Sequence, residues 1–173
     1  MIAIDLDGTL LDYDYDPYRA ESRVNYALLR QLRIAGVEQA AIATIQGGTP
    51  FGLMGAKRRD GRCYPTPEDF MQRLHIACEA LRHAGIEATA ARVCVFHPRA
   101  EARYIQASAR YMRQYMPGLM VPDWTIYTTA AARKPSPLML RSVQASEYWG
   151  DSDEDEGAAQ AAGIPFVRVA RFY

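Results

Sequence analysis

The sequence has few cysteines and no long apolar run. Its 173 residues include Cys63, Cys78 and Cys94, which lie far apart and form no Cys-x-x-Cys pair. Neither a disulfide framework nor a zinc site is therefore expected. No stretch approaches the roughly 20 apolar residues of a membrane-spanning helix. Met1 leads directly into a short apolar run followed by acidic residues, which leaves no place for a signal peptide. These absences predict a cytoplasmic protein with no membrane partner.

A net charge is also absent, because 20 basic and 20 acidic residues cancel. No overall field therefore attracts the chain to nucleic acid or to an anionic membrane, and any preference for polyanions must be local. The apolar fraction of 49% and the charged fraction of 23% are typical of globular domains. We expect a single domain, residues 1–173, that buries its core without disulfides or a structural metal.

Apolar strands and amphipathic helices alternate along the chain. The patterns predict strands at 1–4, 40–45, 92–96 and 166–169, with a further strand closing at 148–149. They predict helices at 21–35, from 66 to about 84, and at 101–115, 137–143 and 154–162. This alternation is typical of an α/β fold with a parallel sheet flanked by helices, whose site lies at the carboxyl edge of the strands. The segment near 99–127 is predicted to be a helical insertion.

Two carboxylates, Asp5 and Asp7, directly follow the first predicted strand, where unpaired charges are costly. A polar turn is the alternative, since Asp and Gly are ordinary turn residues. Thr44 ends the second strand and offers a hydroxyl beside backbone N–H groups. Lys134 precedes Pro135 and Pro137, which open a helix and could hold its single cation rigidly at the sheet edge. The acidic run 151–155 offers the carboxylate oxygens that Mg²⁺ prefers, although such runs also occur at solvated helix N-termini.

Together, Asp-x-Asp-Gly-Thr at 5–9, Thr44, Lys134-Pro135 and the acidic segment 150–155 resemble the haloacid dehalogenase superfamily. The resemblance extends from Asp5 to Gly163. It implies a Rossmann-like sheet and a Mg²⁺-dependent phosphomonoester hydrolase that forms an aspartyl-phosphate intermediate. An acid–base carboxylate at position 7 favours hydrolysis of phosphomonoesters over dehalogenation or ion pumping.

The resemblance also implies a role for each matched residue. Asp5 would be the nucleophile, and Asp7 would protonate the leaving oxygen and then activate water. The phosphoryl oxygens would be bound by Thr44, Lys134, Ile45 and Gly8. The Mg²⁺ ion would be held by Asp5, Asp151 and the backbone carbonyl of Asp7, with Asp155 in support from the outer shell or through water.

The spacing of the motifs leaves no room for a large cap domain. The absence of a cap usually goes with an open site. Segments 44–48, 64–67 and 96–98 resemble the subgroup of histidinol-phosphate phosphatases, heptose-bisphosphate phosphatases and polynucleotide 3'-phosphatases. That subgroup usually has Asn at the position of Ile45, and the zinc loop common in its heptose and histidinol members has no counterpart here.

Four cations cluster after the Thr44 strand, and they are candidate substrate-binding residues for the phosphates of a nucleic-acid end: Lys57, Arg58, Arg59 and Arg62. A solvated loop is the alternative. A polynucleotide 3'-phosphate or a nucleotide is the leading substrate expectation, and a sugar or amino-alcohol phosphate is the second. A phosphotransferase, and a non-catalytic phosphate-binding protein of the same fold, are further alternatives.

Overall fold

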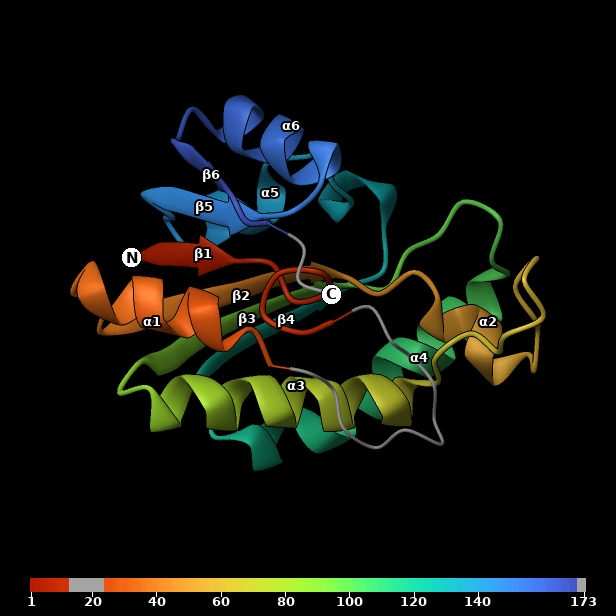
Figure 1. Cartoon of the computed structure of the whole chain (residues 1–173). Helices are drawn as coiled ribbons and strands as arrows, with labels where there is room; N and C mark the ends of the chain where they lie inside the picture. The colour runs from red at the N-terminus through yellow and green to blue at the C-terminus, as the bar shows by residue number, and fades with distance from the viewer. Residues whose placement is uncertain (13–23, 171–173) are drawn as a thin grey trace.

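The computed structural model describes residues 1–12 and 24–170. One six-stranded sheet has the order β4-β3-β2-β1-β5-β6, and every neighbouring pair of strands is parallel (Figure 1). The strands are β1 (Ile2–Ile4), β2 (Gln39–Ile45), β3 (Glu87–Cys94), β4 (Asp123–Tyr127), β5 (Glu147–Gly150) and β6 (Phe166–Arg168). The predicted Rossmann-like α/β fold is confirmed, and the described residues build no large cap domain.

Helices cover both faces of the sheet. They are α1 (Tyr26–Ile34), α2 (Thr49–Leu53), α3 (Pro67–His83), α4 (Ala102–Tyr115), α5 (Leu138–Ser142) and α6 (Asp153–Ala162), with 3₁₀ turns η1 (Met116–Leu119) and η2 (Ala130–Ala132). In Figure 1, α5 and α6 lie on one side of the sheet, and α1 and α3 lie on the other. Among the described residues, no helix combines the length and apolar character that a membrane crossing requires.

The two faces of the sheet carry side chains of different size. Because successive strand residues point to opposite faces, Ile4 and Ile42 pack with α1, α3 and α4, whereas Ala3 and Ala41 pack with α5 and α6. Small side chains on the second face allow those two helices to lie close to the strands. The N-terminus of α6 and the loop before α5 are thereby brought near the carboxyl edge of the sheet.

The start of α3 is confirmed, whereas the start of the first helix lies later in the chain than predicted. Thr66 caps α3 by accepting a hydrogen bond from the N–H of Asp69, whose carboxylate accepts the N–H of Thr66 in return. The helix predicted over 21–35 begins at Tyr26, because Asn25 caps it by accepting the N–H of Leu28. Residues 21–23 lie outside the described part of the chain.

Two elements were not predicted. The segment near 99–127 is helical only in part, because after α4 and η1 it adds the edge strand β4. In β4 only Ile126 is buried, so the strand lacks a clear apolar pattern. The short helix α2 has only five residues. Strand β3 also begins five residues earlier than predicted, at Glu87, where alanines give little β signal.

Candidate functional site

The sheet order places a crevice between β1 and β5. The chain proceeds outward from β1 to β4 and then returns to pair β5 with the other side of β1. In open α/β sheets, ligands bind at the carboxyl ends of the strands where the order reverses in this way. Asp5 directly follows β1, and Asp151 directly follows β5. The two carboxylates therefore come from neighbouring strands that are far apart in the sequence.

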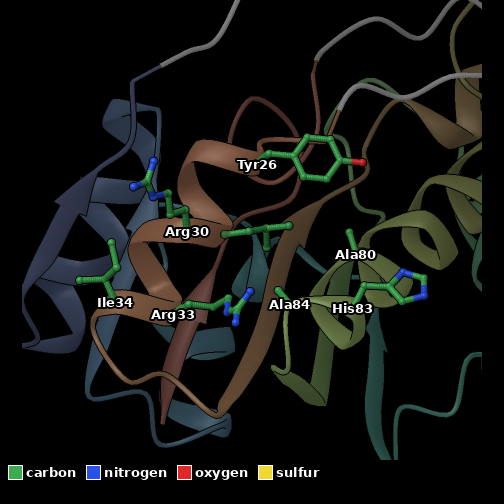
Figure 2. A pocket seen from close by; sticks show the side chains of 8 residues that line it. Tyr26, Arg30, Arg33, Ile34, Ala80, His83 and Ala84 are labelled. Carbon is green, nitrogen blue, oxygen red and sulfur yellow. The ribbon is translucent and has the colours of Figure 1, made fainter.

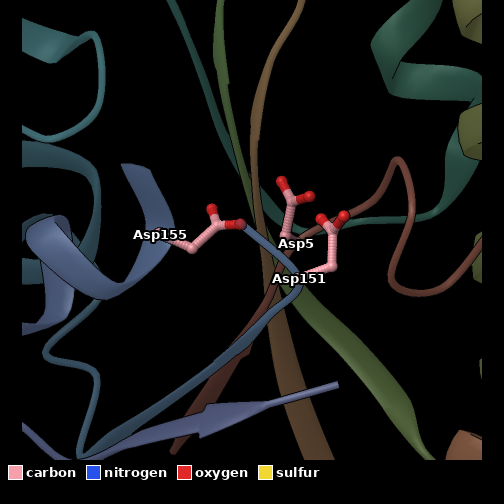
Figure 3. A group of neighbouring side chains, drawn as sticks. All are labelled: Asp5, Asp151 and Asp155. Carbon is pink, nitrogen blue, oxygen red and sulfur yellow. The ribbon is translucent and has the colours of Figure 1, made fainter. Parts of the chain in front are cut away.

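A cavity of about 190 Å³ lies at this edge of the sheet. It is lined by Asp5, Asp7, Thr44, Ile45, Lys134, Ser152, Glu154 and Asp155. Most of the residues that sequence analysis assigned to the nucleophile, the acid–base group, the phosphate and the metal are thus brought together. Asp151 is buried beside them, with its carboxylate next to that of Asp5 (Figure 3).

Lys134 is the central cation of the cavity. Its Nζ donates to Asp5 Oδ1 and to Asp155 Oδ1, each at 2.6 Å, and all three side chains are at least nine-tenths buried. Burial alone would lower the pKa of Lys134, but the two carboxylates outweigh it and raise the pKa above the ordinary value. The ammonium group therefore remains charged at neutral pH.

Asp5 lies in an environment that disfavours its negative charge. Burial raises the pKa of Asp5 well above its ordinary value; Lys134 opposes this rise, and Asp155 and Asp7 add to it. Carboxylate oxygens of Asp5, Asp151 and Asp155 lie within 4.8 Å of one another (Figure 3). Crowded, buried carboxylates fit a hard divalent cation such as Mg²⁺, which would relieve their repulsion.

Asp155 uses both of its oxygens within the protein. Oδ1 accepts hydrogen bonds from Lys134 Nζ and from the Tyr148 hydroxyl, and Oδ2 accepts from the backbone N–H and the hydroxyl of Ser152. Burial raises the pKa of Asp155, but Lys134 and these hydrogen bonds bring it below its ordinary value. Four hydrogen bonds fill the acceptor positions of a carboxylate. Asp155 is therefore better placed to hold Lys134 than to coordinate a cation directly.

Asp7 is held by two side chains that sequence analysis missed. Arg73 Nη2 donates to Asp7 Oδ1 at 2.7 Å and also to the carbonyl of Asp12. Gln46 Nε2 donates to Asp7 Oδ2 at 2.6 Å and to the hydroxyl of Thr44 at 3.0 Å. A signal for Arg73 existed, because it is a cation on the otherwise apolar face of α3.

Tyr148 is the third residue that sequence analysis missed. It is fully buried in the middle of β5, and its hydroxyl lies 2.9 Å from Asp155 Oδ1 and 3.1 Å from the carbonyl oxygen of Ala43. Burial and the neighbouring carboxylates Asp5 and Asp155 raise the pKa of Tyr148 well above its ordinary value. The hydroxyl thus keeps its proton and acts as a donor.

The remaining predicted phosphate ligands differ in whether they line the cavity. Thr44 is buried at the end of β2, and its hydroxyl accepts a hydrogen bond from Gln46 while lining the cavity beside Ile45. Gly8 lies outside the cavity lining, with a positive φ of 81° that suits glycine. Its N–H donates to the carbonyl of Leu11 at 2.7 Å, so this N–H group closes the turn that follows Asp7.

Two glycines allow the N-terminus of α6 to approach the site. A Cβ at Gly150 would lie 2.6 Å from the Cβ of Asp155, and a Cβ at Gly157 would lie 2.9 Å from that of Pro135. Both contacts would force a shift. Glycine at these positions lets Asp155 pack over the end of β5, and lets α6 pack against the residue that follows Lys134.

The basic residues of the segment after α2 lie apart from the cavity. Arg58 and Arg62 are joined by a backbone hydrogen bond, and Lys57 pairs with Cys63, so residues 57–63 form a tight exposed hairpin. We call it the basic hairpin. None of its four predicted substrate-binding cations lines the cavity. In Figure 1 the hairpin lies beyond α2, away from the ends of β1 and β5.

A larger groove of about 680 Å³ lies between α1 and the last turns of α3 (Figure 2). It is lined by Tyr26, Leu29, Arg30, Arg33, Ile34, Ala80, His83 and Ala84. This lining contains no carboxylate and none of the predicted site residues.

Comparisons with protein-family models, with curated proteins and with solved structures find no match to this chain. The cavity at the ends of β1 and β5 is the candidate active site on its geometry and on the chemistry of its side chains.

Proposed function

We propose that this chain is a Mg²⁺-dependent phosphomonoester hydrolase of the haloacid dehalogenase superfamily. The observation that carries the proposal is the buried contact of Lys134 with Asp5, next to Asp151 and Asp7, at the point where the strand order reverses. A carboxylate, a cation and an acid–base group in one small cavity are the parts that phosphoryl transfer needs.

In the first step, Asp5 attacks the phosphorus of the substrate. An oxygen of Asp5 forms a bond to phosphorus, the ester P–O bond breaks, and the leaving oxygen takes a proton from Asp7. Lys134 and Thr44 bind the phosphoryl oxygens and stabilise the charge that they carry in the transition state. The products of this step are the free alcohol and Asp5 carrying a phosphoryl group.

In the second step, water releases the phosphoryl group. Asp7 now accepts a proton from water, the water oxygen bonds to phosphorus, and the bond from phosphorus to Asp5 breaks. Inorganic phosphate leaves, Asp5 returns to its carboxylate form and Asp7 regains its proton. Arg73 and Gln46 donate hydrogen bonds to the two oxygens of Asp7 and thereby hold its carboxylate at the cavity.

Asp5 and Asp151 hold the metal in this proposal, together with the backbone carbonyl of Asp7, as the family resemblance implies. When bound, Mg²⁺ supplies positive charge that offsets the charge of the phosphoryl oxygens and of the crowded carboxylates. Burial raises the pKa of Asp5 and so disfavours its ionised form. A nucleophilic carboxylate must be ionised, and a bound metal ion would favour that form.

Two classes of substrate are proposed. A cavity of about 190 Å³ with no described cap encloses a phosphoryl group and little more, so the alcohol part extends outside. The basic hairpin supports a polynucleotide 3'-phosphate or a nucleotide, provided that the substrate reaches beyond α2. A small metabolite such as a sugar phosphate or an amino-alcohol phosphate needs no such reach and is the second candidate.

Phosphate release from a panel of substrates tests the proposal. The panel contains a 3'-phosphorylated oligonucleotide, sugar and amino-alcohol phosphates and an aryl phosphate, each with Mg²⁺ and with a chelator. We expect release that requires Mg²⁺ and is lost in Asp5→Asn. A preference for the oligonucleotide that weakens steeply with salt would identify a polynucleotide substrate. No release from any ester would instead favour a non-catalytic phosphate-binding protein.

A further inference from the structure

Tyr148 occupies an unusual place for a tyrosine. It is fully buried in the layer of small side chains between the sheet and α5 and α6. Most of its neighbours there are apolar, and a buried tyrosine hydroxyl needs a polar partner. The partners of Tyr148 are the carboxylate of Asp155 and the carbonyl of Ala43. One side chain thus links β5 to α6 and to the end of β2.

The ring of Tyr148 contacts Lys134 as well. Lys134 Nζ lies 5.2 Å from the ring centroid, within the range of a cation–π contact. Tyr148 therefore touches both members of the Lys134–Asp155 ion pair, one through its ring and the other through its hydroxyl. The carbonyl of Ala43 belongs to the same peptide unit as the N–H of Thr44, so the hydroxyl also fixes the strand end that carries Thr44.

We infer that Tyr148 is a positioning residue, which fixes Lys134 and Asp155 relative to Thr44. A lysine side chain is flexible, and about 2 kcal/mol of rotamer entropy opposes its fixation. Three contacts hold Lys134, from Asp5, from Asp155 and from the ring of Tyr148. When Asp5 bonds to phosphorus, its contact with Lys134 changes. Asp155 and Tyr148 then keep the ammonium group in place, so Tyr148 affects the reaction step more than substrate binding.

The mildest test is Tyr148→Phe, which removes the hydroxyl and keeps the ring. The kinetic part of this test rests on the proposed function. Loss of one hydrogen bond in the reacting complex is expected to lower kcat about fivefold to tenfold and to change KM by less than about twofold. Tyr148→Leu also removes the ring that the ammonium group of Lys134 contacts, and it is expected to lower kcat further.

Tyr127→Phe is the matched control. The Tyr127 hydroxyl also makes a side-chain hydrogen bond, to Ser142 at 3.2 Å, but on an exposed surface away from the cavity. We expect its kinetics to equal those of the wild type. In a background of Asp155→Asn, Tyr148→Phe is expected to lower kcat less than it does in the wild type, because the contact of the hydroxyl with the Asp155 carboxylate is already changed.

A labelling experiment tests the inference without any turnover. Lys57 and Lys134 are the two lysines of the sequence, and Lys57 is exposed on the basic hairpin whereas Lys134 is buried. Reductive methylation followed by mass spectrometry measures the labelling rate of each. We expect Tyr148→Phe to raise the rate at Lys134 several-fold and to leave the rate at Lys57 unchanged, whereas Tyr127→Phe changes neither.

The outcomes distinguish a failure of the proposed function from a failure of the role inferred for Tyr148. An inactive wild-type protein would contradict the proposed function, and the labelling rates alone would then decide the role of Tyr148. The inference is overturned if Tyr148→Phe leaves the Lys134 labelling rate unchanged, or if Tyr127→Phe alters it equally. In an active enzyme, an unchanged kcat or a loss confined to KM would overturn it as well.

Discussion

The cavity and the basic hairpin are both clusters of charged residues, but most of the charged groups of the cavity are buried and those of the hairpin are exposed to solvent. In the cavity, Lys134 and its partners Asp5 and Asp155 are buried and lie 2.6 Å apart. In the hairpin, the ion pair of Arg62 and Asp60 spans 3.7 Å between exposed side chains. Exposed pairs contribute little to stability, whereas buried charges are costly unless each is paired. Substitutions in the cavity should therefore have large effects, and the same substitutions in the hairpin should have small ones.

The largest difference is expected between two Asp→Asn substitutions. Asp5→Asn removes the proposed nucleophile and should lower kcat on an aryl phosphate by at least about a thousandfold. Asp60→Asn makes the same chemical change on the hairpin and should leave kcat within about twofold of the wild type. Steady-state kinetics with Mg²⁺ measures both. More than a tenth of the wild-type rate in Asp5→Asn would contradict the assignment.

The two lysines give the next comparison. Lys134→Met removes the cation beside Asp5 and should lower kcat by about 10²–10³, as the loss of one charge-stabilising donor does in other enzymes. Lys57→Met should have no measurable effect on a small ester. The same assay serves for both variants, and comparable losses at the two positions would contradict the proposed role of Lys134.

An arginine substitution should lower the free energy of unfolding much more at the cavity than on the hairpin. Arg73→Leu leaves the Asp7 carboxylate buried without its cation, which should lower the free energy of unfolding by about 3–5 kcal/mol. Arg59→Leu, on the exposed hairpin, should change it by less than about 0.5 kcal/mol. Urea denaturation followed by circular dichroism provides both values. An equally small change in both variants would show that the pair of Arg73 and Asp7 does not support the fold.

A smaller effect is expected on the stability of Asp5→Asn itself. A carboxyl group with a raised pKa in the folded state binds its proton more tightly when folded, so its contribution to stability falls as the pH rises above the ordinary value of 3.8. Without divalent ions, Asp5→Asn should therefore melt at a higher temperature than the wild type at pH 7. The difference should disappear near pH 4. A variant that is less stable than the wild type at pH 7 would contradict the raised pKa that burial gives Asp5.

The smallest effect on a small ester is expected from the hairpin as a whole. Replacing Lys57, Arg58, Arg59 and Arg62 together by glutamine should leave hydrolysis of an aryl phosphate nearly unchanged. If the substrate is a polynucleotide, the same variant should bind an oligonucleotide more weakly and with a shallower salt dependence. Equal losses on both substrates would remove the reason for assigning the hairpin to substrate binding.

The sequence predicted most of the fold because strand and helix patterns in this chain are local. Thr66, Pro67 and Asp69 mark the start of α3, and Gly85 follows its end, with no reference to the rest of the molecule. Strand β4 was missed because an edge strand with one buried residue carries little periodic signal. The charged residue Glu147 in β5 is explained by the shortness of that strand, which has four residues, with Glu147 at its first, half-buried position.

The candidate site was predictable to the extent that its groups follow strand ends. Asp5, Thr44 and Asp151 follow or end parallel strands, whose carboxyl ends meet at one edge of the sheet. Arg73 and Tyr148 were missed because their contacts depend on packing between elements that are distant in the sequence. Arg73 is 66 residues from Asp7, and only its position on an apolar helix face could have marked it.

The central claim is that Asp5 carries the phosphoryl group between the two steps. The most direct test is to mix the protein with a phosphomonoester and Mg²⁺, quench in acid within the first turnover, and map the modified peptide by mass spectrometry. We predict one added phosphoryl group on the peptide that contains Asp5, absent from the Asp5→Asn variant. Phosphate release with no phosphoryl group on that peptide, or with the group on another residue, would contradict the account.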